Sequence, residues 1–268
     1  MNAFDTFVGK LLQLPPNASQ HGVDVDKLIL YLHYLMVLLF IGWSAYFFYA
    51  ILRFRRSRNP KADYVGTTTH ASTWIEVGVA IAEMVLLFGT AIPYWARAAE
   101  KFPEAKQSTV MRVIAQQFNW QARYPGVDGE FGKQDVRLVT KQNPMGIIAM
   151  DPQRKAEDTT GADDRISPLN EMAVPVNKSV IVHLTSLDVI HSFKVVPLRV
   201  TQDANPGMSI PFHFVPTVTN TYQIQCSQLC GNSHYAMRGL FRVLGQAEYD
   251  EWLGSKTTAA AQGAVSYE

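Results

Sequence analysis

The chain has 268 residues, of which 47% are hydrophobic and 18% are charged, and its formal net charge is +1. This length accommodates one domain with its own core together with membrane-spanning segments. The balanced charge argues against the basic surface that nucleic-acid binding requires, so no nucleic acid is expected as a partner. With only two cysteines, the fold does not depend on a framework of disulfides.

Two long apolar runs follow the N-terminal segment 1–27, which lacks the ordered regions of a cleavable signal peptide. The first run extends from Leu28 to Leu52, and a helix of this length crosses a hydrocarbon core about 30 Å thick. The second run extends from about Thr73 to Trp95. Together they predict a transmembrane helix hairpin over residues 28–96.

The loop 53–72 between the two runs is basic and contains Arg53, Arg55, Arg56, Arg58 and Lys61. The positive-inside rule keeps such a short basic loop in the cytoplasm. Two spans then place both the N-terminal segment and the C-terminal domain on the opposite face. We therefore expect a multi-pass protein of the bacterial inner membrane with these parts in the periplasm; in an organelle they would face the intermembrane space.

Two carboxylates interrupt the second apolar run. A charged side chain at the centre of a membrane helix costs about 3 kcal/mol unless it is paired, hydrated or protonated. Glu76 lies about one turn into the helix, where a boundary residue that reaches toward water is the simplest interpretation. Glu83 follows seven residues later on the same helix face and fits either a proton path or a contact with a partner helix.

Residues 97–254 show short β-rich runs separated by Pro, Gly, Asn and Asp, which is typical of an antiparallel sandwich or barrel. A short helix is expected from Gln246 to Leu253, and residues 255–268 are expected to form a mobile tail. The polar stretch 141–168 predicts an exposed surface insertion. The predicted strands are Val110–Phe118, Val136–Thr140, Glu171–Pro175, Ser179–Ser186, His191–Val196, Ser209–Phe214, Thr219–Cys226 and Gly239–Leu244.

Metal-binding side chains gather in the stretch Cys226-Ser-Gln-Leu-Cys230-Gly-Asn-Ser-His234-Tyr-Ala-Met237, with a further imidazole at His191. Thiolate and thioether are soft ligands and imidazole is borderline, a combination that favours copper over calcium or magnesium. A Cys₂His₂ zinc site would not use Met237. The alternatives without a metal are a disulfide between the two cysteines and a methionine that only packs in the core. The clustering of these residues favours the metal site.

This stretch resembles the copper A loop of subunit II of cytochrome c oxidase, which follows the pattern Cys-x-Glu-x-Cys-x-x-x-His-x-x-Met with a distant upstream histidine. The segment Pro15–Gly22, with the pattern Pro-Pro-x-x-Ser-x-His-Gly, the segment Gln202–Gly207 and the helix hairpin are also similar to that family. The resemblance covers nearly the whole chain. It implies a two-helix transmembrane hairpin followed by a periplasmic all-β domain, residues 97–254, folded as a cupredoxin-like Greek-key barrel.

The resemblance also implies a dinuclear copper A centre held by six residues: His191, Cys226, Gln228 through its backbone carbonyl, Cys230, His234 and Met237. In this assignment the two cysteine sulfurs bridge both copper ions. His191 and Met237 complete one ion, and His234 and the Gln228 carbonyl complete the other. Asp188 either orients this site through His191 or serves only as an acceptor in a turn.

By the same resemblance the chain takes electrons from cytochrome c and passes them to subunit I of a terminal oxidase. Subunit I would carry an a-type heme and copper B, reduce oxygen to water and translocate protons, with subunit III as a further partner. Glu76 matches the place of a glutamate at the mouth of one proton channel. Phe118 and Trp120 match residues through which electrons arrive, and a core position is the alternative for Trp120.

Several positions depart from the family pattern. Gln228 stands where the family has Glu, and a neutral amide is a poor ligand for a hard cation. We therefore expect the magnesium or manganese site at the border with subunit I to be weak or absent. Phe118 stands where many relatives have Trp, and Met208 stands where an Arg is common. The residues after Glu76 also differ from the family's Trp-Thr-x-x-Pro.

Three other functions agree with parts of the pattern. A copper A subunit of a nitric oxide reductase would keep the same ligands. A copper chaperone of the Sco type would use Cys-x-x-x-Cys and a distant histidine, but it needs a thioredoxin-like βαβ pattern, which the sequence does not show. A copper-free quinol oxidase subunit would lack the ligands that this chain retains.

Overall fold

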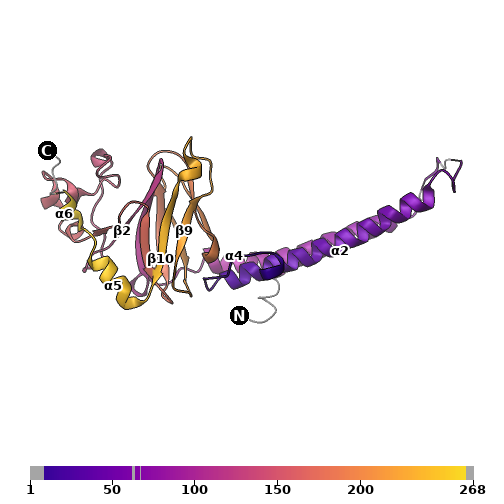
Figure 1. Cartoon of the computed structure of the whole chain (residues 1–268), viewed down its shortest axis with the longest axis horizontal. Coiled ribbons are helices and arrows are strands. Elements are labelled where there is room, and N and C mark those ends of the chain that lie inside the picture. The colour runs from indigo at the N-terminus through magenta and orange to yellow at the C-terminus, as the bar shows by residue number, and fades with distance from the viewer. Residues whose placement is uncertain (1–8, 62–63, 67, 264–268) are drawn as a thin grey trace. The chain divides into compact units, whose positions relative to one another are not determined.

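The computed structural model describes residues 9–61, 64–66 and 68–263 (Figure 1). The chain divides into two units. One is helical and is built mainly from Asp24–Arg97, and the other is a β unit built from Gln13–Val23 and the residues from Ala98 onward.

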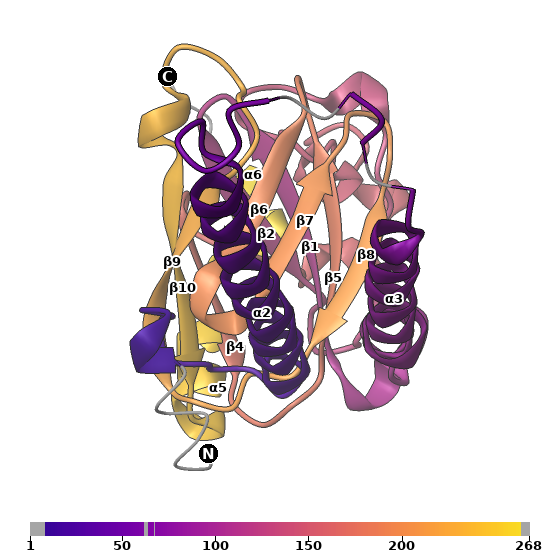
Figure 2. The same ribbon diagram turned by 90° about the vertical axis from the view of Figure 1, so that its right-hand side faces the viewer.

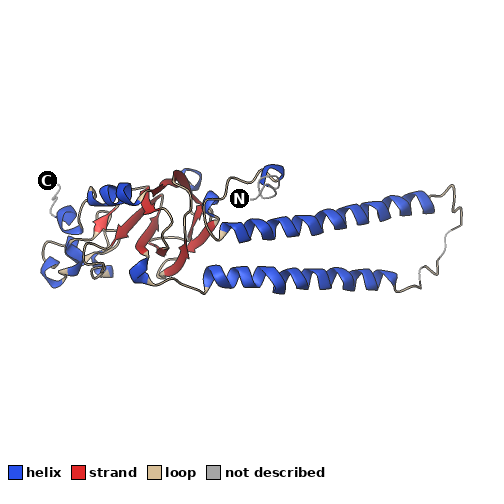
Figure 3. Ribbon diagram, turned by 90° about the horizontal axis from the view of Figure 1, so that it is seen from below, coloured by secondary structure: helices blue, strands red, loops and turns tan. Residues whose placement is uncertain are grey.

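The helical unit contains two long apolar helices that run antiparallel to each other (Figure 3). Helix α2 spans Gly22–Phe54, and the second helix consists of α3 (Ala71–Leu86), a π-helical segment (Leu87–Ala91) and α4 (Ile92–Ala99). Each helix is long and apolar enough to cross a membrane, and no residue in its most apolar stretch is buried. A helix that is apolar all round without a protein core around it fits a lipid environment. The predicted helix hairpin is confirmed.

The β unit is a sandwich of two five-stranded sheets, with the strand orders β3-β2-β1-β5-β8 and β4-β10-β9-β6-β7 (Figure 2). Most neighbouring strands are antiparallel, but β1 runs parallel to β5, and β10 runs parallel to β4. The cupredoxin-like all-β domain is confirmed, whereas purely antiparallel pairing is wrong at these two places, where strands distant in sequence meet. The strands are β1 (Thr109–Gln116), β2 (Asn119–Tyr124), β3 (Arg165–Ile166), β4 (Glu171–Pro175), β5 (Val180–Ser186), β6 (His191–Val195), β7 (Val200–Ala204), β8 (Ile210–Phe214), β9 (Asn220–Cys226) and β10 (Arg238–Leu244).

Aromatic side chains fill the space between the two sheets. Trp120, Phe193 and Phe241 are fully buried, and the ring of Phe193 lies edge-on to the other two at centroid distances of 5.5 and 6.1 Å. Burial of each large apolar side chain contributes about 1.5–3 kcal/mol. Because Trp120 belongs to one sheet and the two phenylalanines belong to the other, this cluster joins the sheets. It does so beside His191, whose ring is 6.1 Å from that of Trp120.

Seven of the eight predicted strands are present, with bounds that shift by at most two residues. The predicted strand Val136–Thr140 is wrong: Val136–Leu138 form a 3₁₀ helix, and the preceding Asp135 accepts a hydrogen bond from the backbone of Arg137. Strands β2, β3 and β7 are not predicted. Strand β2 does alternate polar and apolar residues from Asn119 to Tyr124, but it is only six residues long and directly follows the run that predicts β1.

The expectation of an exposed insertion over 141–168 is wrong, because this segment folds around a second small core. Helix α5 (Gln246–Gly254) matches the predicted closing helix, and helix α6 (Ala259–Gly263) follows it. Ala259 is buried in the second core, so residues 255–263 are not the mobile tail that the sequence predicts; residues 264–268 lie outside the described residues. This core consists of Ile114, Met145, Ile147, Ala149, Met150, Ile166 and Ala259.

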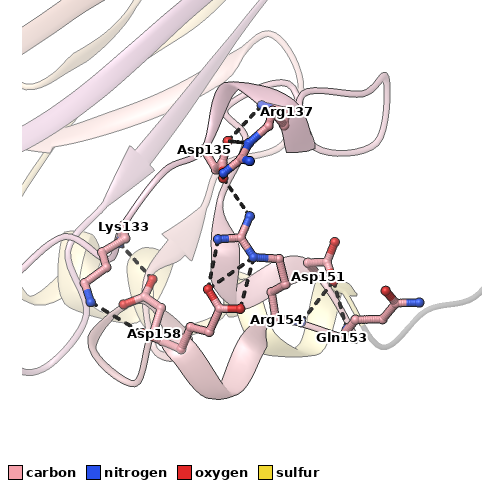
Figure 4. A network of polar contacts seen from close by, with 8 residues as sticks. Lys133, Asp135, Arg137, Asp151, Gln153, Arg154 and Asp158 are labelled. Atoms are coloured by element: carbon pink, nitrogen blue, oxygen red, sulfur yellow. Dashed lines mark hydrogen bonds and ion pairs between the residues drawn. The ribbon is translucent and has the colours of Figure 1, made fainter.

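Ion pairs at the surface of this insertion link it to the neighbouring part of the chain (Figure 4). Asp135 accepts a hydrogen bond of 2.6 Å from Arg154, which also pairs with Glu157. In the interior, Asp164 pairs with Arg123, and both of these side chains are fully buried. The insertion is therefore an ordered part of the domain rather than a plain surface loop.

Candidate metal centre

Two neighbouring strands bring the distant histidine to the cysteine loop. His191 is the first residue of β6 and Cys226 is the last residue of β9, and the antiparallel pairing of these strands sets Phe193 opposite Cys226. The Nδ1 atom of His191 lies 3.9 Å from the Sγ atom of Cys226, although 35 residues separate the two along the chain. Sheet pairing therefore places this predicted ligand beside the loop, which loop spacing alone cannot do.

The loop between β9 and β10 folds back on itself and brings its remaining ligands together. Its two ends are joined by a hydrogen bond of 3.2 Å from the Cys226 amide to the Met237 carbonyl. A short 3₁₀ helix, His234–Ala236, precedes Met237. As a result, the Sγ atom of Cys230 lies 3.6 Å from Nδ1 of His234 and 3.7 Å from Sδ of Met237.

The two cysteines are free thiols whose sulfur atoms lie 3.7 Å apart, well beyond the disulfide bond length of about 2.05 Å. The backbone carbonyl oxygen of Gln228 lies 3.2 Å from Sγ of Cys226. Ligand atoms of His191, Cys226 and Cys230 all lie within 4.8 Å of one another. The six predicted ligands thus come together at one place in the domain.

The chemistry of these donors suits copper. Two thiols, a thioether and two imidazoles form a soft and borderline set, without the carboxylates that a hard cation prefers. His191, Cys230 and Met237 are buried, and Cys226 is partly buried. Burial, and then the neighbouring thiol of Cys226, raise the pKa of the Cys230 thiol to about 12. A metal ion that binds these sulfurs therefore has to displace protons.

Asp188 holds the ring of His191. Its Oδ1 atom lies 2.9 Å from Nε2 of the imidazole, and its Oδ2 atom accepts a hydrogen bond of 2.7 Å from the backbone of Gln117. Burial opposes the ionisation of Asp188, but the hydrogen bonds from Gln117 and His191 hold its pKa below the ordinary value. An imidazole that donates from Nε2 to this carboxylate keeps the lone pair of Nδ1 for a metal. Asp188 also accepts from the backbone of Val189, so it fills both of the roles considered for it.

The aromatic residues that match the electron path of the family lie near the centre. Trp120 is fully buried and its ring lies edge-on to that of His191, so it is a core residue as well as the neighbour of a predicted ligand. Phe118 is partly buried, and its ring lies against Gly231 of the ligand loop. Glu76 and Glu83 belong to helix α3 of the helical unit, and both side chains are exposed.

One residue that contacts the centre, Gln117, is not identified by the sequence analysis. Gln117 lies in the turn between β1 and β2, and its side chain donates a hydrogen bond of 2.6 Å to the carbonyl oxygen of Cys230. No motif marks this glutamine. The only signal in the sequence is its place directly before Phe118.

Comparison with known proteins identifies the family. Residues 110–242 match the family described as "Cytochrome C oxidase subunit II, periplasmic domain". The alternative cytochrome c oxidase subunit 2 of Bradyrhizobium diazoefficiens is 32% identical over 212 residues, which are 79% of this chain and 73% of the relative. Cytochrome c oxidase subunit 2 of Cereibacter sphaeroides is 26% identical over 243 residues, 89% of this chain and 78% of the relative. Among solved structures, the periplasmic domain of subunit II of cytochrome oxidase of Bradyrhizobium japonicum is 26% identical with a TM-score of 0.41, covering 58% of this chain and 96% of that one.

The apolar helix pair, the cupredoxin-like domain and the sulfur-rich centre define a membrane-anchored protein with a candidate copper site. The similarity over most of its length then gives the particular family: the chain belongs to the cytochrome c oxidase subunit II family. It is therefore a subunit of a heme–copper oxidase, an oxidoreductase that works as an assembly of subunits. The family that the ligand loop resembles is confirmed.

Proposed function

We propose that the chain is the electron-accepting subunit of a terminal heme–copper oxidase. It takes electrons from cytochrome c at a dinuclear copper A centre and delivers them to heme in subunit I, where oxygen is reduced to water and protons are translocated. The observation that carries this proposal is the convergence of two free thiols, 3.7 Å apart, with two imidazoles and a thioether.

Each residue of the centre has a role in this proposal. The sulfurs of Cys226 and Cys230 would hold both copper ions, and the bound pair would supply a carrier for single electrons. The packed side chains keep positions that suit both oxidation states, so little rearranges on electron transfer. The neutral side chain of Gln228 leaves the magnesium or manganese site at the border with subunit I weak or absent. The remaining ligands form two pairs: His191 with Met237, and His234 with the carbonyl of Gln228.

Phe118 and Trp120 form the proposed route by which electrons reach the centre. Phe118 is the more exposed of the two, and its ring lies against the ligand loop, so it is the proposed entry point for electrons. Trp120 contacts the imidazole of His191 edge-on at 6.1 Å. A change at Phe118 is therefore expected to alter the reaction with the donor, whereas a change at Trp120 also disturbs the core.

The proposed location is the bacterial inner membrane, with residues 1–27 and 97–254 in the periplasm and the basic loop 53–72 in the cytoplasm. Subunit I, which holds an a-type heme and copper B, and subunit III are the membrane partners. Glu76 marks the mouth of a proton channel of subunit I. Its exposed carboxylate on an apolar helix needs water or a polar partner, which supports a protein contact at this place.

A copper A subunit of a nitric oxide reductase is the second candidate, since it would use the same ligands. The relatives named cytochrome c oxidase subunit 2 favour the oxidase. A Sco-type copper chaperone is disfavoured because the described part of the chain contains no βαβ unit, and because such a chaperone has no use for His234 and Met237.

Oxygen uptake by the purified complex tests the proposal. With reduced cytochrome c as the donor, the complex that contains the wild-type chain should consume oxygen. The complex with Cys226→Ser should assemble but lose nearly all of this activity, because one of the two bridging sulfurs is gone. Consumption of nitric oxide in place of oxygen would favour the reductase, and oxygen uptake unaffected by Cys226→Ser would refute the role of the centre.

A further inference from the structure

Gln117 links the two segments that carry the ligands. It lies in the turn between β1 and β2 of one sheet, whereas His191 and the cysteine loop belong to strands of the other sheet. The Nε2 atom of Gln117 donates to the carbonyl oxygen of Cys230 at 2.6 Å. The backbone N–H of Gln117 donates to Oδ2 of Asp188 at 2.7 Å. A single residue therefore contacts both ligand-bearing segments.

The backbone contact extends to the histidine ligand. Oδ1 of Asp188 lies 2.9 Å from Nε2 of His191, so this carboxylate bridges the amide of Gln117 to the imidazole. The side-chain contact ends on the peptide that follows Cys230. The β1–β2 turn thus restrains the ring of one ligand and the backbone of another.

The ligand loop is shaped for this contact. Gly231 has a φ of +137°, which residues with a side chain rarely adopt. A Cβ atom at this position would lie 2.7 Å from Nε2 of Gln117 and 3.1 Å from the ring of Phe118. A side chain at residue 231 would displace the amide of Gln117 and press on the ring of Phe118.

We propose that Gln117 is a positioning residue of the metal centre, which together with Asp188 holds Cys230 and His191 in place before a metal ion binds. We call Gln117 and Asp188 the clamp. Its role rests on the proposed function, which makes copper the bound metal. Ligands that are already ordered lose less conformational freedom on binding, and partners of this kind commonly change metal affinity about 10- to 100-fold.

The side-chain contact of Gln117 can be removed while its backbone contact with Asp188 stays. Gln117→Leu removes the donor at similar volume. Gln117→Asn keeps an amide, but the side chain is shorter by one C–C bond, about 1.5 Å, and no longer reaches Cys230. Gln116→Leu is the matched control, because the side chain of Gln116 bonds Asn119 within the same hairpin at 2.9 Å.

The experiment uses the full chain in detergent, loaded with copper. Three quantities are measured for each variant: the rate of copper transfer to a chelator, the thiolate-to-copper absorption bands and the thermal unfolding temperature. Both Gln117 variants should release copper about fivefold faster than wild type, the ratio that matches one net hydrogen bond of about 1 kcal/mol. Their absorption bands should also shift, since the sulfur of Cys230 is less well fixed. Gln116→Leu should match the wild type in both properties.

Wild-type release rates and bands in both Gln117 variants would overturn the clamp. Equal acceleration by Gln116→Leu would overturn it too, because it would reflect a general loosening of the hairpin. If Gln117→Leu does not fold, Gln117→Asn decides the outcome. A wild-type chain that binds no pair of copper ions refutes the proposed function and the clamp together, whereas normal loading of the wild type with unchanged release in the variants refutes the clamp alone.

Discussion

Replacement of Gly231 by alanine tests how closely the ligand loop must approach the β1–β2 turn. A φ of +137° costs a residue with a side chain about 1–3 kcal/mol. The new methyl group would also lie 2.7 Å from Nε2 of Gln117 and 3.1 Å from the ring of Phe118, so the amide of Gln117 has to leave its contact with Cys230 or the loop has to move. We expect Gly231→Ala to destabilise the protein by about 2 kcal/mol and to weaken copper binding about tenfold, because Cys230 moves with the loop.

Gly129→Ala is the matched control for this substitution. Gly129 also has a positive φ, +73°, but nothing in the described structure beyond its chain neighbours lies within 4 Å of an added Cβ. The control therefore introduces backbone strain of about 1–2 kcal/mol without a steric contact. Chemical denaturation and copper titration of the full chain compare the two variants. If Gly231→Ala binds copper as tightly as Gly129→Ala does, the close approach does not matter and the reasoning is refuted.

Three further predictions concern the insertion and the metal preference. Asp164→Ala should lower the free energy of unfolding, measured by chemical denaturation, by about 3–5 kcal/mol because it leaves the buried charge of Arg123 unpaired. The double variant Asp164→Leu with Arg123→Met should lower it far less. A loss below about 1 kcal/mol for Asp164→Ala would contradict this prediction. Hydrogen bonds from Arg137, and then from Arg154, lower the pKa of Asp135, so their stabilisation is present above the ordinary carboxyl pKa and is lost as the pH falls below it. Asp135→Asn should thus lose less stability in acid than wild type, and identical profiles of unfolding temperature against pH would argue against it. Gln228→Glu should keep the thiolate absorption and strengthen manganese binding in the assembled complex; unchanged manganese content by metal analysis would contradict the prediction.

The candidate site is only partly predictable from the sequence. Cys226, Cys230, His234 and Met237 lie in one short loop, so their spacing alone indicates a common site. His191 joins them in the prediction through the family resemblance, and in the protein through the pairing of β6 with β9. The contact of Gln117 could not be predicted, because it depends on how a turn of one sheet packs against a loop of the other.

The fold shows the same limit. Continuous apolar runs predict the two long helices well, because every face of a membrane helix is apolar. The sequence of the insertion 141–168 predicts a loop because charged residues dominate it. Two of these charged residues nevertheless stabilise its fold: Asp164 pairs with Arg123 in the interior, and Arg154 pairs with Asp135 at the surface. Buried polar residues that have a partner do not add to the hydrophobic periodicity by which a helix or strand is recognised in a sequence. Their partners can be identified only from the three-dimensional structure.

Copper analysis and the visible spectrum of the full chain test the central claim most directly. If the sulfurs of Cys226 and Cys230, 3.7 Å apart, hold a pair of metal ions, the loaded chain contains two copper ions and is purple, and Cys226→Ser abolishes the colour. A chain that binds one copper ion or none, or one whose two cysteines are recovered as a disulfide under loading conditions, would contradict the account. Retention of both copper ions by Cys226→Ser would contradict it equally.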